Sequence, residues 1–140
     1  MQPDLALAAH AAEISLPGYG WRGGLPRWQT RQHIKRAHVL VNCSLVEGGA
    51  QVILEAVQSG TPVLASCISG NIGMLGTDYA GYFAVGDDAA LAALLQRCAA
   101  EPDFLALLEK QCSQRAHRFS PLEEKRLVLS LLQHALRPAQ

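Results

Sequence analysis

The segments EGGAQVILEA (residues 47–56) and VQSGTPVLAS (residues 57–66) contain the clearest structural pattern of this chain. Two carboxylates, Glu47 and Glu55, stand eight positions apart, and two glycines follow the first of them. Gly60 with Pro62 just beyond it is typical of the end of a helix. The pattern therefore predicts a strand, a glycine turn, a helix over 50–59, a tight turn and a second strand over 63–66.

The predicted turn at Gly48 and Gly49 leads directly into a helix, whose first amides have no partner within the helix. These amides and the helix dipole favour an anion, and glycine lets a ligand approach the backbone closely. Ionised carboxylates accept strong hydrogen bonds from the vicinal hydroxyls of sugars. Glu47 and Glu55, about 12 Å apart if a helix joins them, can therefore bracket a diphosphate. A Gly-Gly turn also precedes helices that bind nothing, and a mid-helix glutamate is more often solvated.

The rest of the chain alternates strands with helices. Residues 38–43 form a β-branched apolar run, as expected of a strand that is buried on both faces of a parallel sheet. This alternation predicts an α/β fold with a Rossmann-like parallel sheet flanked by helices. Short strands are also predicted at 19–22 and 82–85, and helices at 4–14, 27–37, 89–100, 103–117 and from Pro121 onward. Asp87 and Asp88 are the expected caps of the helix at 89–100, and Ser120 with Pro121 is expected to start the last helix.

A segment rich in turn formers follows the strand at 63–66, and the sequence predicts a loop over 69–73. In open α/β sheets, ligands bind beyond the carboxyl ends of the strands. The loop residues Gly70, Asn71, Ile72 and Gly73 are therefore candidates to border a bound nucleotide. An ordinary surface loop fits the same pattern equally well.

Composition excludes several classes of function. Lys plus Arg and Asp plus Glu both number 12, so no net charge attracts nucleic acid or an anionic membrane, and no apolar run is long enough for a membrane span. The four cysteines form no CxxC pair, so we expect no metal site. We expect free thiols and a cytoplasmic location. Cys43 and Cys67 are expected to be buried at the ends of strands. The dinucleotide and triphosphate glycine motifs are missing, which leaves no indication of a bound cofactor.

The segment from Glu47 to Glu55 resembles the E-x7-E signature of the retaining, family-4 type glycosyltransferases of the glycosyltransferase-B fold. The flanking segments GLP (24–26), VLV (39–41) and TPVLA (61–65) resemble those on either side of that signature. The resemblance covers about residues 19–136. Within the family, VEGGA (46–50) and GNIGMLGTDYAGYF (70–83) are similar to the subgroup that includes the selenosugar synthase of selenoneine biosynthesis.

This resemblance implies an enzyme of two Rossmann-like domains with the active site between them, the donor bound mainly by the C-terminal one, and no metal. The implied reaction transfers a sugar from a UDP-sugar-type donor, a co-substrate rather than a cofactor, to an acceptor, which in the named subgroup is selenophosphate. The resemblance implies that Glu47 binds the donor hexose and is catalytic, and that Glu55 binds the ribose. Backbone N–H groups of Gly48, Gly49 and Ala50 would contact the sugar or the phosphate. The residues that would lie beside the nucleotide are Gly70, Asn71, Ile72 and Gly73.

Two parts of the family pattern have no counterpart in this sequence. These are the acceptor domain and the first part of the donor domain, which carries the Arg and Lys that neutralise the diphosphate. We therefore expect residues 1–140 to be a single partial domain, the donor-binding half, with little activity alone. Its expected partners are a nucleotide-sugar and either an acceptor-domain chain or a second copy. An inactive nucleotide-sugar binding fragment and a sugar-nucleotide epimerase-like domain stay open, although the sequence shows no convincing acid–base pair for an epimerase.

Overall fold

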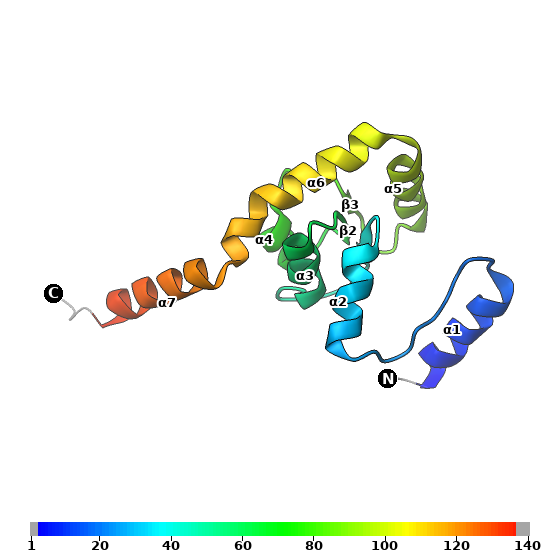
Figure 1. Ribbon diagram of the computed structural model, residues 1–140, viewed down its shortest axis with the longest axis horizontal. Helices are drawn as coiled ribbons and strands as arrows, with labels where there is room; N and C mark the ends of the chain where they lie inside the picture. The colour runs from blue at the N-terminus through cyan, green and yellow to red at the C-terminus, as the bar shows by residue number, and fades with distance from the viewer. Residues whose placement is uncertain (1–2, 137–140) are drawn as a thin grey trace. The chain divides into compact units, whose positions relative to one another are not determined.

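The computed structural model describes residues 3–136 of the chain, which form two compact units that divide at Thr30 (Figure 1). The first unit contains helix α1 (Pro3–Ser15). The backbone N–H of Trp21 donates to Glu13 Oε1 at 2.7 Å, and the indole meets the His10 ring edge-on. The strand predicted over 19–22 is wrong, because this backbone is held by a side chain of α1 and not by a neighbouring strand.

The second unit is built on a three-stranded parallel sheet in the order β1-β2-β3. The strands are β1 (Leu40–Asn42), β2 (Val63–Ser66) and β3 (Tyr82–Phe83). All four residues of the central strand β2 are buried, as its unbroken apolar sequence predicts. The predicted α/β fold with a parallel sheet is therefore confirmed, although β1 and β3 are shorter than expected.

Helices connect and cover the strands, with α3 following β1 and α4 following β2. Helix α3 contacts β1, β2 and α4, and the long helix α6 packs across α3 and α4 (Figure 1). No helix within residues 3–136 is long and apolar enough to cross a membrane. The helices are α2 (Arg27–Arg36), α3 (Gln51–Ser59), α4 (Ser69–Leu75), α5 (Asp88–Ala100), α6 (Pro102–Ala116), the 3-10 helix η1 (His117–Phe119) and α7 (Pro121–Ala135).

The helix ends follow the sequence signals closely. Gly60 ends α3 with a φ of 76°, a left-handed conformation that favours glycine. The Asp87 carboxylate accepts a hydrogen bond from the N–H of Ala90 at 2.8 Å, so α5 begins with a side-chain cap. Ser120 caps α7 in the same way through the N–H of Glu123 at 3.2 Å. Local chemistry therefore fixes where these three helices start or stop.

The loop predicted over 69–73 is wrong, because these residues belong to helix α4. Gly70, Asn71 and Leu75 are buried, and Asn71 hydrogen-bonds to Ser66 at the end of β2. Glycine and asparagine have weak intrinsic helix propensity, but packing against the sheet overrides it here. The residues are consequently held in a fixed helix and not in a surface loop.

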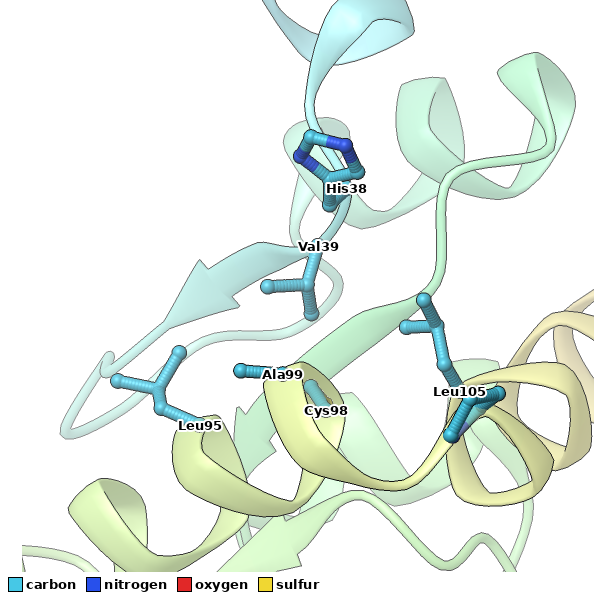
Figure 2. Close-up of a pocket in the computed structure, with 7 residues that line it drawn as sticks. His38, Val39, Leu95, Cys98, Ala99 and Leu105 are labelled. Atoms are coloured by element: carbon cyan, nitrogen blue, oxygen red, sulfur yellow. The ribbon is translucent and has the colours of Figure 1, made fainter.

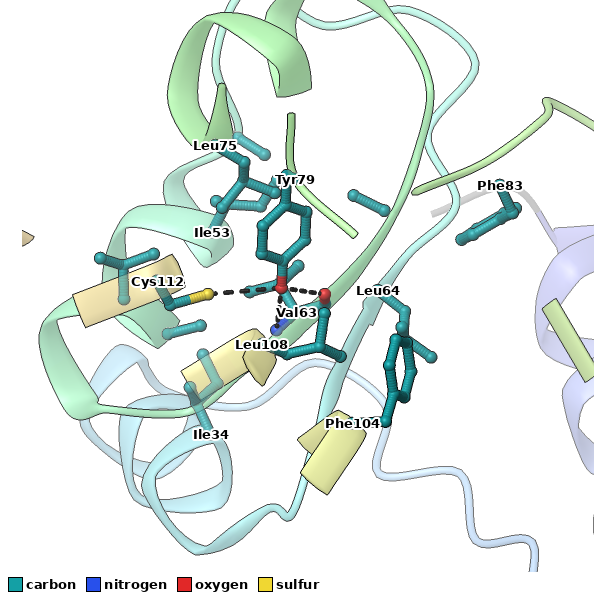
Figure 3. Packing of buried hydrophobic residues seen from close by; sticks show 14 residues of the cluster. Ile34, Ile53, Val63, Leu64, Leu75, Tyr79, Phe83, Phe104, Leu108 and Cys112 are labelled. Atoms are coloured by element: carbon teal, nitrogen blue, oxygen red, sulfur yellow. Dashed lines mark hydrogen bonds between the residues drawn. The ribbon is translucent and has the colours of Figure 1, made fainter. Parts of the chain in front are cut away.

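Tyr79 completes the core at the start of β2 (Figure 3). Its hydroxyl accepts a hydrogen bond from the N–H of Val63 at 3.1 Å, donates one to the C=O of the same residue, and lies 3.4 Å from Cys112 Sγ. Burial raises the pKa of the Tyr79 hydroxyl and also that of the Cys112 thiol. Both backbone groups of Val63 are thus satisfied by one buried side chain.

Replacing Tyr79 with phenylalanine is expected to lower the free energy of unfolding by about 1–3 kcal/mol, because two buried backbone groups lose their partner. Urea denaturation followed by circular dichroism measures the change. Tyr19→Phe, at an exposed position, is the matched control and should change stability by less than about 0.5 kcal/mol. Equal stabilities for the two variants would show that Val63 finds other partners.

The cysteines are free thiols, but two of them lie elsewhere than expected. Cys43 and Cys67 were predicted to be buried at strand ends and are exposed, because β1 and β2 each end one residue before them. Cys98 is half-buried and Cys112 is buried. The prediction of burial at Cys43 and Cys67 is therefore wrong.

Candidate functional site

The candidate site lies at the carboxyl ends of β1 and β2. Residues 43–50, here called the glycine loop, connect β1 to α3 and contain Glu47, Gly48 and Gly49. Because β1 and β2 are parallel, this loop and the start of α4 emerge at the same edge of the sheet. This is the edge at which α/β proteins bind ligands.

Glu47 is half-buried, and its two carboxylate oxygens have different environments. Oε1 accepts a hydrogen bond from Ser44 Oγ at 2.6 Å. Oε2 is buried and has no hydrogen-bond partner among the described residues. A buried polar atom without a partner is costly, so such atoms need an explanation. A ligand hydroxyl could satisfy this oxygen only after a neighbouring group moves aside, because Oε2 is buried in the free chain.

The amino end of α3 leaves backbone N–H groups without a partner in the helix, and no acidic side chain in the first turn occupies them. Ala50 is the N-cap residue, no side chain caps the helix, and the first turn contains no acidic residue. The N–H of Ile53 bonds to the C=O of Ala50, so the two helical amides before Ile53 have no partner within the helix. The helix start therefore has the chemistry that binds an anion.

Gly48 and Gly49 are exposed, and the protein itself does not require glycine at either position. Neither has a left-handed φ, a Cβ on Gly48 would meet nothing within 4 Å, and a Cβ on Gly49 would make an ordinary contact with Met74. The space beside Gly48 is thus open.

Helix α4 packs directly against the glycine loop. A Cβ on Gly70 would overlap the C=O oxygen of Glu47 and lie 2.8 Å from its carbonyl carbon. Asn71 is fully buried, and its Nδ2 donates to the C=O of Ser66 at 2.9 Å. Ile72 is half-buried and Gly73 is exposed. The structure therefore brings Gly70 beside Glu47 and joins Asn71 to Ser66, and a contact of α4 with a nucleotide stays a prediction.

Glu55 lies in the middle of α3 with only 4% of its surface exposed. The expectation that one helix joins the two carboxylates is wrong, because Glu47 precedes α3 and residues 47–50 are not helical. A helical rise of 12 Å therefore does not describe their separation. The role of Glu55 at a ribose stays a prediction.

Sequence reasoning missed a set of polar residues that connects the glycine loop to the sheet. Ser66 Oγ donates to the C=O of Ser44 at 2.6 Å, and the N–H of Ser44 donates to Asn42 Oδ1 at 3.1 Å. Asn42 and Ser66 share one feature in the sequence, because each is a polar residue at the end of an otherwise apolar strand. That signal could have identified Asn42 and Ser66 as supports of the site.

A family model for the glycosyl transferases group 1 matches residues 9–119, which is most of the chain. The chain belongs to the glycosyl transferases group 1 family. The matched region includes the sheet, the glycine loop and α4, so the site described above lies inside the part of the chain that the family model matches. A search of curated proteins found no match. The family supports glycosyl transfer as the general activity.

This glycosyltransferase chain also has a hollow that we do not assign to the donor. It is an apolar groove of about 480 Å³ between the residues before β1 and helices α5 and α6 (Figure 2). His38 and Val39 lie on one side of it, and Leu95, Cys98 and Leu105 on the other. His38 and Val39 precede β1, whereas ligands of parallel sheets bind beyond the carboxyl ends.

Proposed function

We propose that this chain is the donor-binding part of a glycosyltransferase and that it binds a nucleotide-sugar of the UDP-sugar type. The observation that carries this proposal is the unpartnered Oε2 of Glu47, a residue of the glycine loop that leads into the uncapped start of α3. A sugar hydroxyl would satisfy the carboxylate oxygen. The helix start would at the same time attract the diphosphate.

Each part of the donor has a candidate partner in this proposal. Glu47 accepts hydrogen bonds from the hexose, and the backbone N–H groups at Gly48, Gly49 and Ala50 approach the diphosphate. Glu55 serves the ribose, and the amino half of α4, residues 70–73, borders the nucleotide. Glu47 is the proposed catalytic residue because its carboxylate, when hydrogen-bonded to the sugar, orients the reacting ring. No metal enters this scheme.

The proposed acceptor site belongs to a partner, which is either an acceptor-domain chain or a second copy of this chain. The proposal therefore separates donor binding from transfer, and turnover by the chain alone is expected to be weak. Selenophosphate is the first acceptor to test, since residues 46–50 and 70–83 resemble the selenosugar synthase subgroup. Binding without turnover under any acceptor would favour the alternative of an inactive nucleotide-sugar binding fragment.

Isothermal titration calorimetry with UDP-glucose, UDP and glucose tests the proposal. UDP-glucose is expected to bind roughly tenfold more tightly than UDP, because one charge-assisted hydrogen bond to the sugar is worth about 1.5 kcal/mol or more. Gly48→Ala should weaken both ligands without changing the melting temperature, since its Cβ meets only open space in the free protein. Titrations with ADP- and GDP-glucose determine the base. No binding of any nucleotide-sugar at millimolar concentration would contradict the proposal.

A further inference from the structure

The side chain of Ser44 connects Glu47 to the sheet. Ser44 Oγ donates to Glu47 Oε1 at 2.6 Å, a distance typical of a charge-assisted O–H···O bond. The N–H of Ser44 donates to Asn42 Oδ1, on the last residue of β1. The backbone of Ser44 is thus held by β1 while its hydroxyl holds the carboxylate.

A second set of hydrogen bonds fixes Ser44 from the other side, and its direction is determined. Asn71 Nδ2 donates to Ser66 Oγ at 3.2 Å, so this hydroxyl accepts there and directs its own hydrogen to the C=O of Ser44 at 2.6 Å. Asn71 and Ser66 are 0% and 1% exposed, so bulk water has little access to these bonds. Hydrogen bonds in such chains polarise one another. This series of hydrogen bonds runs from α4 through β2 to the glycine loop.

These contacts determine which oxygen of Glu47 is left without a hydrogen-bond partner. The terminal torsion of a glutamate is broad, so a free carboxylate can turn either oxygen toward a substrate. Here Oε1 is engaged by Ser44, and Oε2 is buried without a partner. We propose that Ser44 is a positioning residue, which acts through Glu47 by orienting its carboxylate so that Oε2 receives the donor sugar. This inference rests on the proposed function, because the orientation matters only if Glu47 binds the sugar.

A double-mutant cycle tests this inference, with calorimetric affinity for UDP-glucose as the measurement. Ser44→Ala is expected to weaken UDP-glucose binding roughly tenfold in the wild-type background and less than about twofold in the Glu47→Gln background. Ser44→Thr retains the hydroxyl and should restore most of the affinity. Binding of UDP, which lacks the sugar, should stay unchanged in all variants. Ser113→Ala, at an exposed position of α6, is the control.

The outcomes separate this inference from the proposed function. Equal losses from Ser44→Ala in both backgrounds would show a merely structural role and overturn the inference, as would unchanged affinity of Ser44→Ala. If Ser44→Ala unfolds, Ser44→Cys, which has a similar shape but is a weak donor, provides the same comparison. A wild-type chain that does not bind UDP-glucose, or a Glu47→Gln variant that binds it equally well, would overturn the proposed function and the inference with it.

Discussion

Replacing Gly70 with alanine is expected to abolish binding of UDP-glucose and to lower the free energy of unfolding by about 1–3 kcal/mol. The new Cβ would overlap the C=O oxygen of Glu47 and approach the Gly48 carbonyl carbon to 3.1 Å. Both are backbone atoms, so neither can move aside as a flexible side chain would. Either α4 or the glycine loop must shift, and Glu47 then loses its position. Calorimetry and urea denaturation measure the two effects.

Gly73→Ala is the matched control for the effect of Gly70→Ala on stability, because both residues lie in α4. A Cβ on Gly73 would meet nothing within 4 Å, and Gly73 has no left-handed φ. Alanine at this position should retain the folded state and stabilise it by about 0.5–1 kcal/mol. Binding of UDP-glucose by Gly70→Ala at wild-type strength would show that contact between α4 and the glycine loop does not determine the position of Glu47.

Replacing Glu47 with glutamine is expected to weaken binding of UDP-glucose roughly 10–100-fold. Hydrogen bonds to a charged group contribute about 1.5–3 kcal/mol, and 1.4 kcal/mol corresponds to a factor of ten in the dissociation constant. Glutamine retains the size of the side chain but removes the charge and turns one of its two acceptors into a donor. Because the lost contact is with the sugar, the affinity for UDP should stay unchanged. Calorimetric titration of both ligands measures the difference.

Glu124→Gln is the control for this charge removal, since Glu124 lies exposed in the first turn of α7. It should bind UDP-glucose as the wild-type chain does. A Glu47→Gln variant that loses UDP and UDP-glucose affinity equally would place Glu47 at the nucleotide and not at the sugar. A Glu47→Gln variant that retains both affinities would show that Glu47 does not belong to the binding site.

The parts of the fold that depend on local chemistry could be predicted from the sequence. The unbroken apolar residues of β2 predict a buried parallel strand, and its four residues are all buried. Gly60 predicts the end of α3 because only glycine adopts a left-handed φ without strain. Asp87 and Ser120 predict the starts of α5 and α7 through their side-chain oxygens. In each case the cause lies within a few residues of the effect.

The parts that depend on contacts between distant segments could not be predicted. Gly70 and Asn71 resemble loop residues locally, yet packing on the glycine loop and hydrogen bonds to Ser66 place them in α4. The separation of Glu47 and Glu55 also depends on where α3 begins, which the spacing of eight does not reveal. The sequence predicted a turn at Gly48 and Gly49 between a strand and a helix, and the glycine loop lies there. It did not indicate that Ser44 and Ser66 connect that site to the sheet.

The most direct test of the account is a crystal structure of the chain with bound UDP-glucose. The account predicts a hydroxyl of the glucose about 2.7 Å from Glu47 Oε2, with Ser44 Oγ still bonded to Oε1 and the diphosphate at the start of α3. A glucose bound away from Glu47, or a diphosphate bound away from the carboxyl edge of the sheet, would contradict it.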